Sequence, residues 1–274
     1  MSSPVVSVCI PVYNAECFIT QTINSVLAQT FQDFEIIIVD NASTDNTMMK
    51  IRKFKDDRIK VYSNKNNIGM VANWNKCLTY SSGEYVKFLC ADDLMLPGLL
   101  ERQVDVLNKN PKVSLVSSGS YIINEENKVV AKRMKIRNDG VYTGEKMARK
   151  SLRIGNIFGE PTTVMFRKDT LDATGPFDLN YFYAPDWDMW LKLMYVGDFY
   201  FIHDYLSKFR VSKSSTTTNI MFKKGKEMIR NDKLLLMSHK AYSRIKISKS
   251  DEIIHYINLI KSFILKAVFL KFVV

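Results

Sequence analysis

Residues 83–98 read GEYVKFLCADDLMLPG, and this stretch decides the fold that the sequence predicts. An apolar run at residues 85–89 is followed by two adjacent carboxylates, Asp92 and Asp93, and then by Pro97 at the start of a helical pattern. The pattern predicts a buried strand that ends in two acids, at the sheet edge where open α/β folds bind ligands. Taken alone, the pair favours a simpler role, because aspartate is common in turns and helix caps.

On both sides of this stretch, predicted strands and helices alternate. Apolar runs typical of buried strands occupy residues 5–11, 35–40, 59–63 and 85–89. Helical spacing is found from residue 16 onward and at residues 48–55, 70–80 and 99–108. This order indicates a mainly parallel sheet with right-handed crossovers. The later pattern predicts strands at 113–123, 161–167 and 199–209 and helices at 168–174 and 185–196. Within 124–150 it predicts a hairpin or a mobile loop region, followed by a short helix.

Composition bounds the class of protein. The 274 residues suffice for one large α/β domain, or for one domain with a smaller appendage. Hydrophobic residues make up 46% and charged residues 24%, which are ordinary globular values. The 39 Lys+Arg outnumber the 28 Asp+Glu, so the net charge is +11. This excess suits anionic partners such as nucleotides, lipid phosphates, an anionic membrane face or nucleic acid.

The four cysteines show neither Cys-x-x-Cys nor Cys/His metal spacing, and Cys9 and Cys90 lie in or beside apolar strand patterns. They indicate reduced, mostly buried thiols, as in a cytoplasmic protein. The first residues, MSSPVVSVCIPVYN, carry no secretory pattern. Because no run of roughly 18 uninterrupted apolar residues is present, we expect no transmembrane helix.

The last part of the chain is basic and helical in pattern. A polar segment at residues 212–219, expected to be flexible, precedes it. An isoleucine stripe then marks the final helix at Ile253, Ile254, Ile257, Ile260 and Ile264. Two interpretations stay open. The helix packs on the core or on a second copy of the chain, or it lies on an anionic membrane, which the net charge favours.

Five motifs in order resemble one family. The segment VSVCIPVYNAECFITQTINSVLAQTFQDFEIIIVDNASTDNT is similar to the start of the glycosyltransferase family 2 catalytic domain. The resemblance continues through NNIGMVANWNKCL, GEYVKFLCADDLMLPG, GPFD and PDWDMWLKL. It implies an inverting enzyme of the GT-A fold, a Rossmann-like, mainly parallel sheet flanked by helices. The domain is expected at residues 1–215, with a donor half to about 116 and an acceptor half from about 117. A helical C-terminal extension, residues 216–274, follows.

The resemblance places a nucleotide-sugar donor at the first strand ends. The donor contacts that it implies are Pro11, Val12, Tyr13, Asn14, Asp40, Asn67, Gly69, Asn75, Asp92 and Arg210. The alternative role for Tyr13 is packing at a strand edge, and for Asp40 it is a helix cap. Gly69 indicates a turn conformation open to few other residues. Arg210 is the candidate for the diphosphate, with a solvated basic loop as its alternative.

The family's acidic motif is usually Asp-x-Asp-Asp, and here it reads Cys90-Ala91-Asp92-Asp93. The resemblance implies a Mn²⁺ or Mg²⁺ ion on Asp92 and Asp93, which neutralises the departing diphosphate as a Lewis acid. Cys90 stands where the first acid is expected. Because hard Mg²⁺ prefers oxygen ligands, we interpret this thiol as a packing residue.

An inverting enzyme needs a general base on the acceptor side of the sugar. The family carries this acid at the start of a late helix, and PDWDMWLKL places Asp186 there, after Pro185 in the first helical turn. The alternative role for Asp186 is to complement the helix dipole. Asp188 faces elsewhere and is expected to pair with Lys192, four residues further on.

The leading hypothesis is a metal-assisted, inverting glycosyltransferase of surface-polysaccharide assembly. It would move a sugar from a UDP- or dTDP-activated donor, with a UDP-sugar favoured, to a lipid-linked or glycan acceptor, in the cytoplasm or peripherally on the inner membrane face. The alternative is a degenerate GT-A module that binds nucleotide or glycan without turnover, which Cys90 motivates. A nucleotidyltransferase is disfavoured because CIPVYNAECF lacks a Gly/Arg/Lys-rich phosphate loop. A nucleic-acid binder is ranked last, since it explains the net charge but not the acidic motifs.

Overall fold

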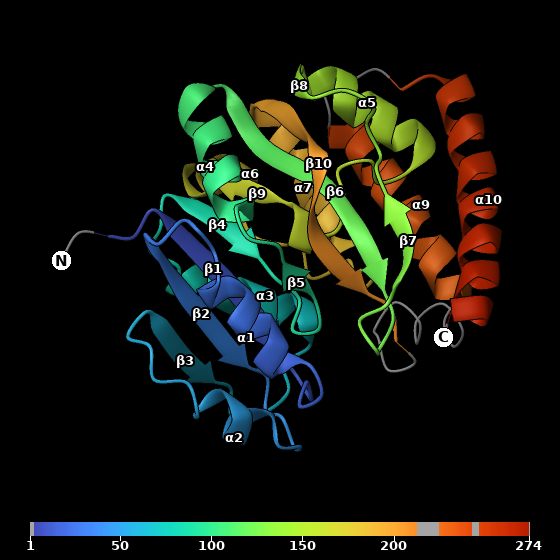
Figure 1. The fold of residues 1–274 in the computed structure, drawn as a ribbon. Helices are drawn as coiled ribbons and strands as arrows, with labels where there is room; N and C mark the ends of the chain where they lie inside the picture. The colour runs from blue at the N-terminus through green and yellow to red at the C-terminus, as the bar shows by residue number, and fades with distance from the viewer. Residues whose placement is uncertain (1–2, 213–224, 243–246, 274) are drawn as a thin grey trace.

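A computed structural model describes residues 3–212, 225–242 and 247–273 (Figure 1). The strands are β1 (Val6–Val12), β2 (Phe34–Asp40), β3 (Ile59–Ser63), β4 (Tyr85–Phe88), β5 (Leu94–Met95), β6 (Val113–Ile123), β7 (Val129–Arg133), β8 (Gly140–Tyr142), β9 (Met165–Arg167) and β10 (Asp198–Arg210). The helices are α1 (Ile19–Leu27), α2 (Thr47–Ile51), α3 (Met70–Tyr80), α4 (Leu99–Lys109), α5 (Gly144–Ile154), α6 (Leu171–Thr174), α7 (Pro185–Val196), α9 (Gly225–Tyr242) and α10 (Lys249–Val273).

In these residues the strands form one ten-stranded sheet with the order β3-β2-β1-β4-β9-β6-β10-β5, and β7 and β8 pair with β6 and β10. The first four strands are parallel. Strand β9 runs antiparallel between β4 and β6, and β10 is parallel to β6. The sheet is therefore parallel in the donor half, as predicted, and mixed in the acceptor half.

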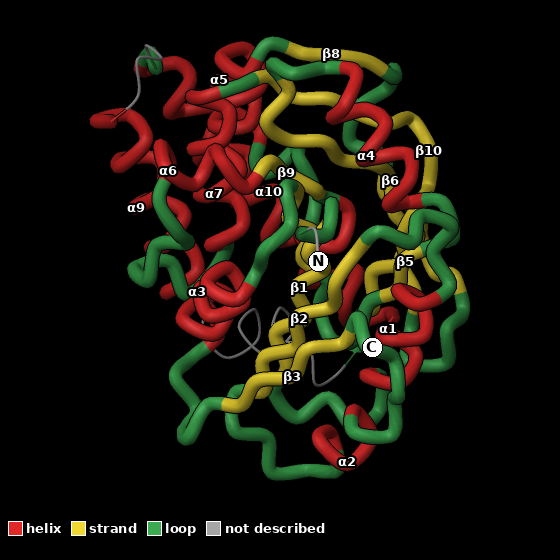
Figure 2. Tube along the Cα trace, turned by 90° about the vertical axis from the view of Figure 1, so that its left-hand side faces the viewer, coloured by secondary structure: helices red, strands yellow, loops and turns green. Residues whose placement is uncertain are grey.

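Side chains of the central strands alternate between two hydrophobic layers, because successive residues of a strand point to opposite faces. Val8 and Ile38 lie in the layer that α1 and α4 cover, whereas Cys9 and Ile37 lie in the layer that α3, α5 and α7 cover. Figure 2 shows these helices on the two sides of the strands. All seven positions of β2 are buried, which explains the continuous apolar run at its residues 36–39.

The sequence pattern failed at one strand. The run predicted at residues 161–167 begins as a 3₁₀ turn, Pro161–Thr163, and only β9 pairs with the sheet. Pro161 cannot donate to a strand ladder, and the Thr163 N–H bonds instead to the Glu160 carbonyl at 2.9 Å. Residues 168–174 form a 3₁₀ turn, Lys168–Thr170, followed by α6. Except for Ser212, the predicted polar segment lies outside the described residues.

The C-terminal extension packs on the acceptor half, at the side of the molecule away from β3 (Figure 1). Leu235 and Leu236 of α9 belong to the main hydrophobic cluster, and Leu270 of α10 packs with Ile122 and Val211 in a smaller one. Among the described residues, only α10 has a length and composition that would let a helix cross a membrane. Lysines interrupt its apolar run, which is why the sequence pattern predicted no such helix.

Candidate active site

The candidate site lies at the carboxyl edge of the parallel strands, where β1 and β2 end and where the acid loop, residues 90–93, follows β4. Pro11 and Val12 close β1, and the Val12 carbonyl accepts a hydrogen bond from the Asn41 N–H at 2.8 Å. Tyr13 follows with half of its surface exposed. The Asn14 N–H donates to Ser43 Oγ at 2.9 Å, so the β1 loop is tied to the turn after β2. A ligand at this edge would meet the Tyr13 ring.

Asp40 ends β2 and is buried, and both of its carboxylate oxygens accept the Ser43 N–H, at 3.2 and 3.3 Å. Its neighbour Asn41 was not predicted as a site residue. Asn41 Nδ2 donates to Asn67 Oδ1 at 2.9 Å and to the Gly69 carbonyl at 3.3 Å. Asn67 and Gly69 are therefore held beside the end of β2. A polar residue directly after IIIVD was the available sequence signal.

Gly69 has a φ of +87°, so the predicted special turn conformation is confirmed. Asn75, in contrast, is directed to another segment. Its Nδ2 donates to the Phe177 carbonyl at 2.9 Å, and its Oδ1 accepts the Phe177 N–H at the same distance. Asn75 thus joins α3 to the GPFD loop, and this reciprocal bond favours a positioning role over a donor contact.

Asp93 is fully buried and is bound by protein groups on both oxygens. Oδ1 accepts the Arg210 N–H at 2.8 Å, and Oδ2 accepts the Thr162 hydroxyl. Burial and the nearby Asp92 raise the pKa of Asp93 well above its usual value. Beneath it, the buried Lys87 donates to the Thr162 carbonyl at 2.5 Å, and burial lowers the pKa of Lys87. The geometry favours Asp93 as a brace of the acid loop, and a lysine inside YVKFL was the missed signal.

Arg210 is buried beneath the acid loop, and its guanidinium is fully used. Nε donates to the Asp92 carbonyl at 2.8 Å, and the other nitrogens donate to the Asn124 and Glu125 carbonyls and to the Gln21 and Asn127 side chains. The group also lies 4.3 Å above the Phe18 ring. Because a guanidinium has five N–H donors, little is left for a diphosphate. This geometry favours a positioning role for Arg210.

Asp92 is half-buried; its backbone carbonyl accepts the Arg210 Nε–H, and its carboxylate interacts with Arg210 electrostatically. Cys90 is also half-buried, and burial, followed by the carboxylates of Asp93, Asp92 and Asp186, raises the pKa of its thiol well above the ordinary value. A protonated thiol agrees with the packing role expected for Cys90. Its interaction with Asp186 also shows that the acid loop and the start of α7 lie near each other.

Asp186 lies in the first turn of α7, after Ala184 with a φ of +59°. Asn156 Nδ2 lies 3.4 Å from its Oδ2. Burial raises the pKa of Asp186 to about 6, and Lys266 of α10 opposes that rise. A carboxylate with this pKa is a stronger base than an exposed aspartate and is still ionised at neutral pH.

Asp188, two residues later, is buried in an ion pair. Its Oδ2 lies 2.6 Å from Lys192 Nζ, which confirms the predicted i, i+4 pairing. Its Oδ1 lies 2.9 Å from Nε2 of His239 on α9. These contacts commit Asp188 to joining α7 to the C-terminal extension.

A metal would have few ready-made ligands here. In the part of the chain that the structure describes, no group of three or more His, Cys, Asp or Glu side chains is placed to hold a metal ion. Asp92 fits one carboxylate ligand. Mg²⁺-like ions usually bind through one or two carboxylates together with substrate phosphates and water. The donor set therefore fits a metal that is bound jointly with a diphosphate.

An open α/β sheet with carboxylates at its carboxyl edge is the architecture of GT-A nucleotide-sugar transferases. The family model of glycosyl transferase family 2 matches residues 7–175. The chain is 32% identical over 221 residues to the UDP-Glc:α-D-GlcNAc-diphosphoundecaprenol β-1,3-glucosyltransferase WfgD of Escherichia coli, covering 80% of this chain and 82% of that protein. It is 30% identical over 220 residues to an uncharacterized glycosyltransferase of Rickettsia typhi, covering 80% and 68%. The chain belongs to glycosyl transferase family 2, and it is a glycosyltransferase.

Solved structures confirm the fold. TarS residues 1–349 of S. aureus in complex with UDP-GlcNAc has a TM-score of 0.65 and 20% identity, covering 94% of this chain and 80% of that chain. The mannosyltransferase PcManGT from Pyrobaculum calidifontis, in complex with GDP-Man and Mn²⁺, has a TM-score of 0.60 and 15% identity, covering 98% and 88%. The predicted family and the predicted GT-A fold with a C-terminal helical extension are confirmed.

Proposed function

We propose that this glycosyltransferase transfers a sugar, with inversion, from a UDP-sugar to a hydroxyl group of a lipid-diphosphate-linked acceptor. The observation that carries the proposal is Asp186, a carboxylate from the acceptor half with a pKa near 6 beside the acid loop. The UDP-GlcNAc complex of TarS and the name of WfgD, which is 32% identical, support the donor and acceptor classes.

In the proposed reaction, Asp186 takes the proton from the acceptor hydroxyl as that oxygen bonds to the anomeric carbon. The bond between the anomeric carbon and the diphosphate oxygen breaks, and UDP leaves with the bonding electrons. Attack opposite to the leaving group inverts the configuration. Such an attack requires the base and the leaving group on opposite sides of the sugar, and a base in the acceptor half with a donor site in the other half would provide this.

The donor would lie along the carboxyl edge, with its base at Tyr13 and Asn14 and its ribose toward Asp40. The loop that holds Asn67 and Gly69 borders the same place. Asp92 is the proposed ligand of a Mn²⁺ or Mg²⁺ ion, which would neutralise charge on the departing diphosphate. Asp93, Arg210 and Asn75 are proposed to hold this arrangement in place.

We further propose that the enzyme works on the cytoplasmic face of the cell membrane, with α10 against the lipid. The outer face of α10 consists of Ile253, Ile257, Ile260, Ile264 and Val268, which are 48–61% exposed. Residues 253–272 contain three lysines and no acid, which suits anionic headgroups. The alternative occupant is a second copy of the chain. It is less favoured, because the stripe from Ile253 to Val268 spans only about two heptads.

Donor binding and turnover test the proposal separately. UDP-, GDP- and dTDP-sugars, each with and without Mn²⁺, are screened by thermal shift, and UDP-sugars are expected to stabilise the enzyme most. Transfer is then assayed with a GlcNAc diphosphate that carries a long alkyl chain. Asp186→Asn should lower transfer by about 10²–10⁴-fold and keep UDP-sugar binding, because only the base is lost.

Asp172→Asn, a change at an exposed residue of α6, is the matched control and should transfer normally. Donor binding without any transfer or donor hydrolysis would instead support the degenerate binding module that Cys90 suggested. The absence of stabilisation by every nucleotide-sugar would contradict the proposed function itself.

A further inference from the structure

Helix α9 of the C-terminal extension holds the loop that leads to the proposed base. Asn231 Oδ1 accepts the Tyr183 N–H at 3.0 Å, and Asn231 Nδ2 donates to the Asn180 carbonyl at 3.3 Å. Tyr183 precedes Asp186 by three positions. The extension therefore reaches the acceptor side of the active site.

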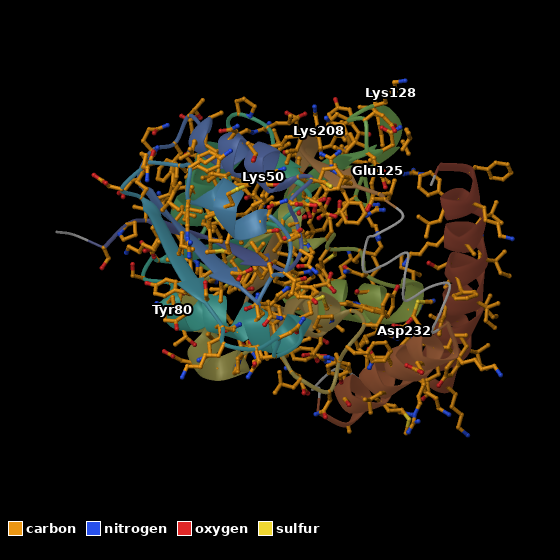
Figure 3. The ribbon with its side chains drawn as sticks, turned by 90° about the horizontal axis from the view of Figure 1, so that it is seen from below. Lys50, Tyr80, Glu125, Lys128, Lys208 and Asp232 are labelled. Atoms are coloured by element: carbon orange, nitrogen blue, oxygen red, sulfur yellow. The ribbon has the colours of Figure 1, made fainter. Side chains whose placement is uncertain are left out.

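The next residue of α9, Asp232, is a buried carboxyl group without a complete set of partners. It is 4% exposed, and its Oδ1 has no hydrogen-bond partner among the described residues. Figure 3 labels Asp232 where α9 meets the body of the molecule. It interacts electrostatically with Asp186 and Lys266, and burial raises its pKa to about 7. Because an unpaired buried polar atom is costly, Asp232 is a candidate for contact with a ligand.

Two ammonium groups lie on the same side. Lys266 Nζ of α10 is 3.4 Å from the Tyr183 hydroxyl, and Lys135 Nζ donates to the Asn156 carbonyl at 2.5 Å. Each interacts with Asp186 and with the other lysine, although α10 and the segment after β7 are far apart in sequence. Ala131 of β7 and Phe263 and Ala267 of α10 pack against the same small hydrophobic cluster, which brings these segments together. Neither lysine forms an ion pair with a carboxylate in the described chain.

We propose that Asp232 and Lys266 of the C-terminal extension form, with Lys135, the acceptor subsite beside Asp186. Asp232 accepts a hydrogen bond from a hydroxyl of the acceptor sugar, and the two ammonium groups bind the acceptor diphosphate. Two ammonium groups that form no ion pair with a carboxylate can bind the two negative charges of a diphosphate. A carboxylate oxygen that lacks a donor can accept a hydrogen bond from a hydroxyl. The subsite rests on the proposed function and deepens it, because it explains how a diphosphate-linked acceptor would be selected.

Calorimetric binding with UDP present tests the subsite. The two probes are decyl-diphospho-GlcNAc and decyl GlcNAc, which lacks the diphosphate. Lys266→Gln should weaken binding of the diphosphate probe by about tenfold, the usual effect of a charge-assisted hydrogen bond, and leave the uncharged probe unchanged. Lys266→Arg should restore binding. Asp232→Asn should weaken both probes by about tenfold, because the sugar contact is common to them.

Lys240→Gln is the matched control, since Lys240 lies on α9 and pairs with Glu252 at the surface; both probes should bind it normally. Circular dichroism checks that each variant is folded. The subsite would be overturned if Lys266→Gln bound the diphosphate probe as tightly as the control does. It would also be overturned if the wild type bound both probes with the same affinity. UDP titrations report on the proposed function separately, because a failed subsite leaves UDP binding intact.

Discussion

At the residue scale, Asp186 and Asp188 show how two acids in one helical turn acquire different roles. The helical period places Asp188 over Lys192, and the sequence predicted this pair correctly. Asp186 lies near Asn156 and interacts electrostatically with Cys90 of the acid loop, and burial raises its pKa to about 6. The residue type and position of Asp186 were predictable from the PDWDMW motif. Its pKa was not, because it depends on Glu160 and Lys266, which lie far away in the sequence.

The raised pKa of Asp186 predicts an acid limb in the pH profile of transfer. The base acts only when ionised, so kcat should fall by about tenfold per pH unit below pH 6. Lys266 lowers the pKa of Asp186, so its removal in Lys266→Gln should move the acid limb to higher pH. Within the described residues, the titratable groups that interact electrostatically with Asp186 are Cys90, Lys135, Glu160, Tyr183, Asp232 and Lys266.

Initial rates at saturating donor and acceptor, measured from about pH 4.5 to about pH 8, locate this limb in the wild type and in Lys266→Gln. Lys240→Gln serves as the control and should keep the wild-type profile. A flat profile through pH 6, or an unchanged limb in Lys266→Gln, would contradict Asp186 as the titrating base.

Other residue roles depended on partners that no local pattern reveals. Asp93 bonds to Arg210 and Asn75 to Phe177, across separations of 117 and 102 residues. A motif shows which residues recur together, but the hydrogen-bond partner decides whether a polar group faces a ligand or braces a loop. Lys87 makes the same point, because lysine is usually exposed, whereas this one is fully buried and donates to the Thr162 carbonyl.

At the element scale, strongly periodic segments were predicted with their observed bounds. Helices α3 and α7 and strand β6 agree with the sequence pattern at both ends. Short elements whose partners lie far away were predicted less well. Strand β9 has only three residues, and its pairing with β4 and β6 rather than its own pattern makes it a strand.

Arg210 at the end of β10 connects three elements, and Arg210→Lys should therefore destabilise the fold. An ammonium cannot reproduce the planar set of bonds to the acid loop and to the turn after β6. Lost bonds to the Asp92, Asn124 and Glu125 carbonyls should reduce the free energy of unfolding by about 1–3 kcal/mol. Urea denaturation measures the change. The matched control is Arg102→Lys at the exposed ion pair with Asp204, where we expect a loss below about 0.5 kcal/mol. Equal losses in both variants would argue against this bracing role.

At the scale of the whole molecule, the hydrophobic core does not stop at the composition change near residue 215, because residues of the C-terminal extension take part in it. Leu235 and Leu236 lie in the main hydrophobic cluster, and His239 pairs with Asp188 beneath α7. Hydrophobic pattern alone could not assign these contacts, because the apolar residues of α9 indicate that one face of the helix is covered but not which element covers it.

The outer face of α10 predicts binding to anionic membranes. The net charge of +11 would attract the protein to vesicles that contain anionic lipid, and burial of the isoleucines would hold it there. In vesicle sedimentation assays the double variant Ile257→Glu/Ile264→Glu should bind at least about tenfold more weakly, because two charges would replace apolar side chains that enter the lipid. Leu179→Glu is the control and should bind normally, because Leu179 is 65% exposed but lies between α6 and α7 and not on α10. Added salt should weaken wild-type binding by screening. A different result would contradict membrane binding: neither protein sediments with vesicles, and in size-exclusion chromatography the wild type elutes as a dimer and the double variant as a monomer. In that case the outer face of α10 binds a second copy of the chain.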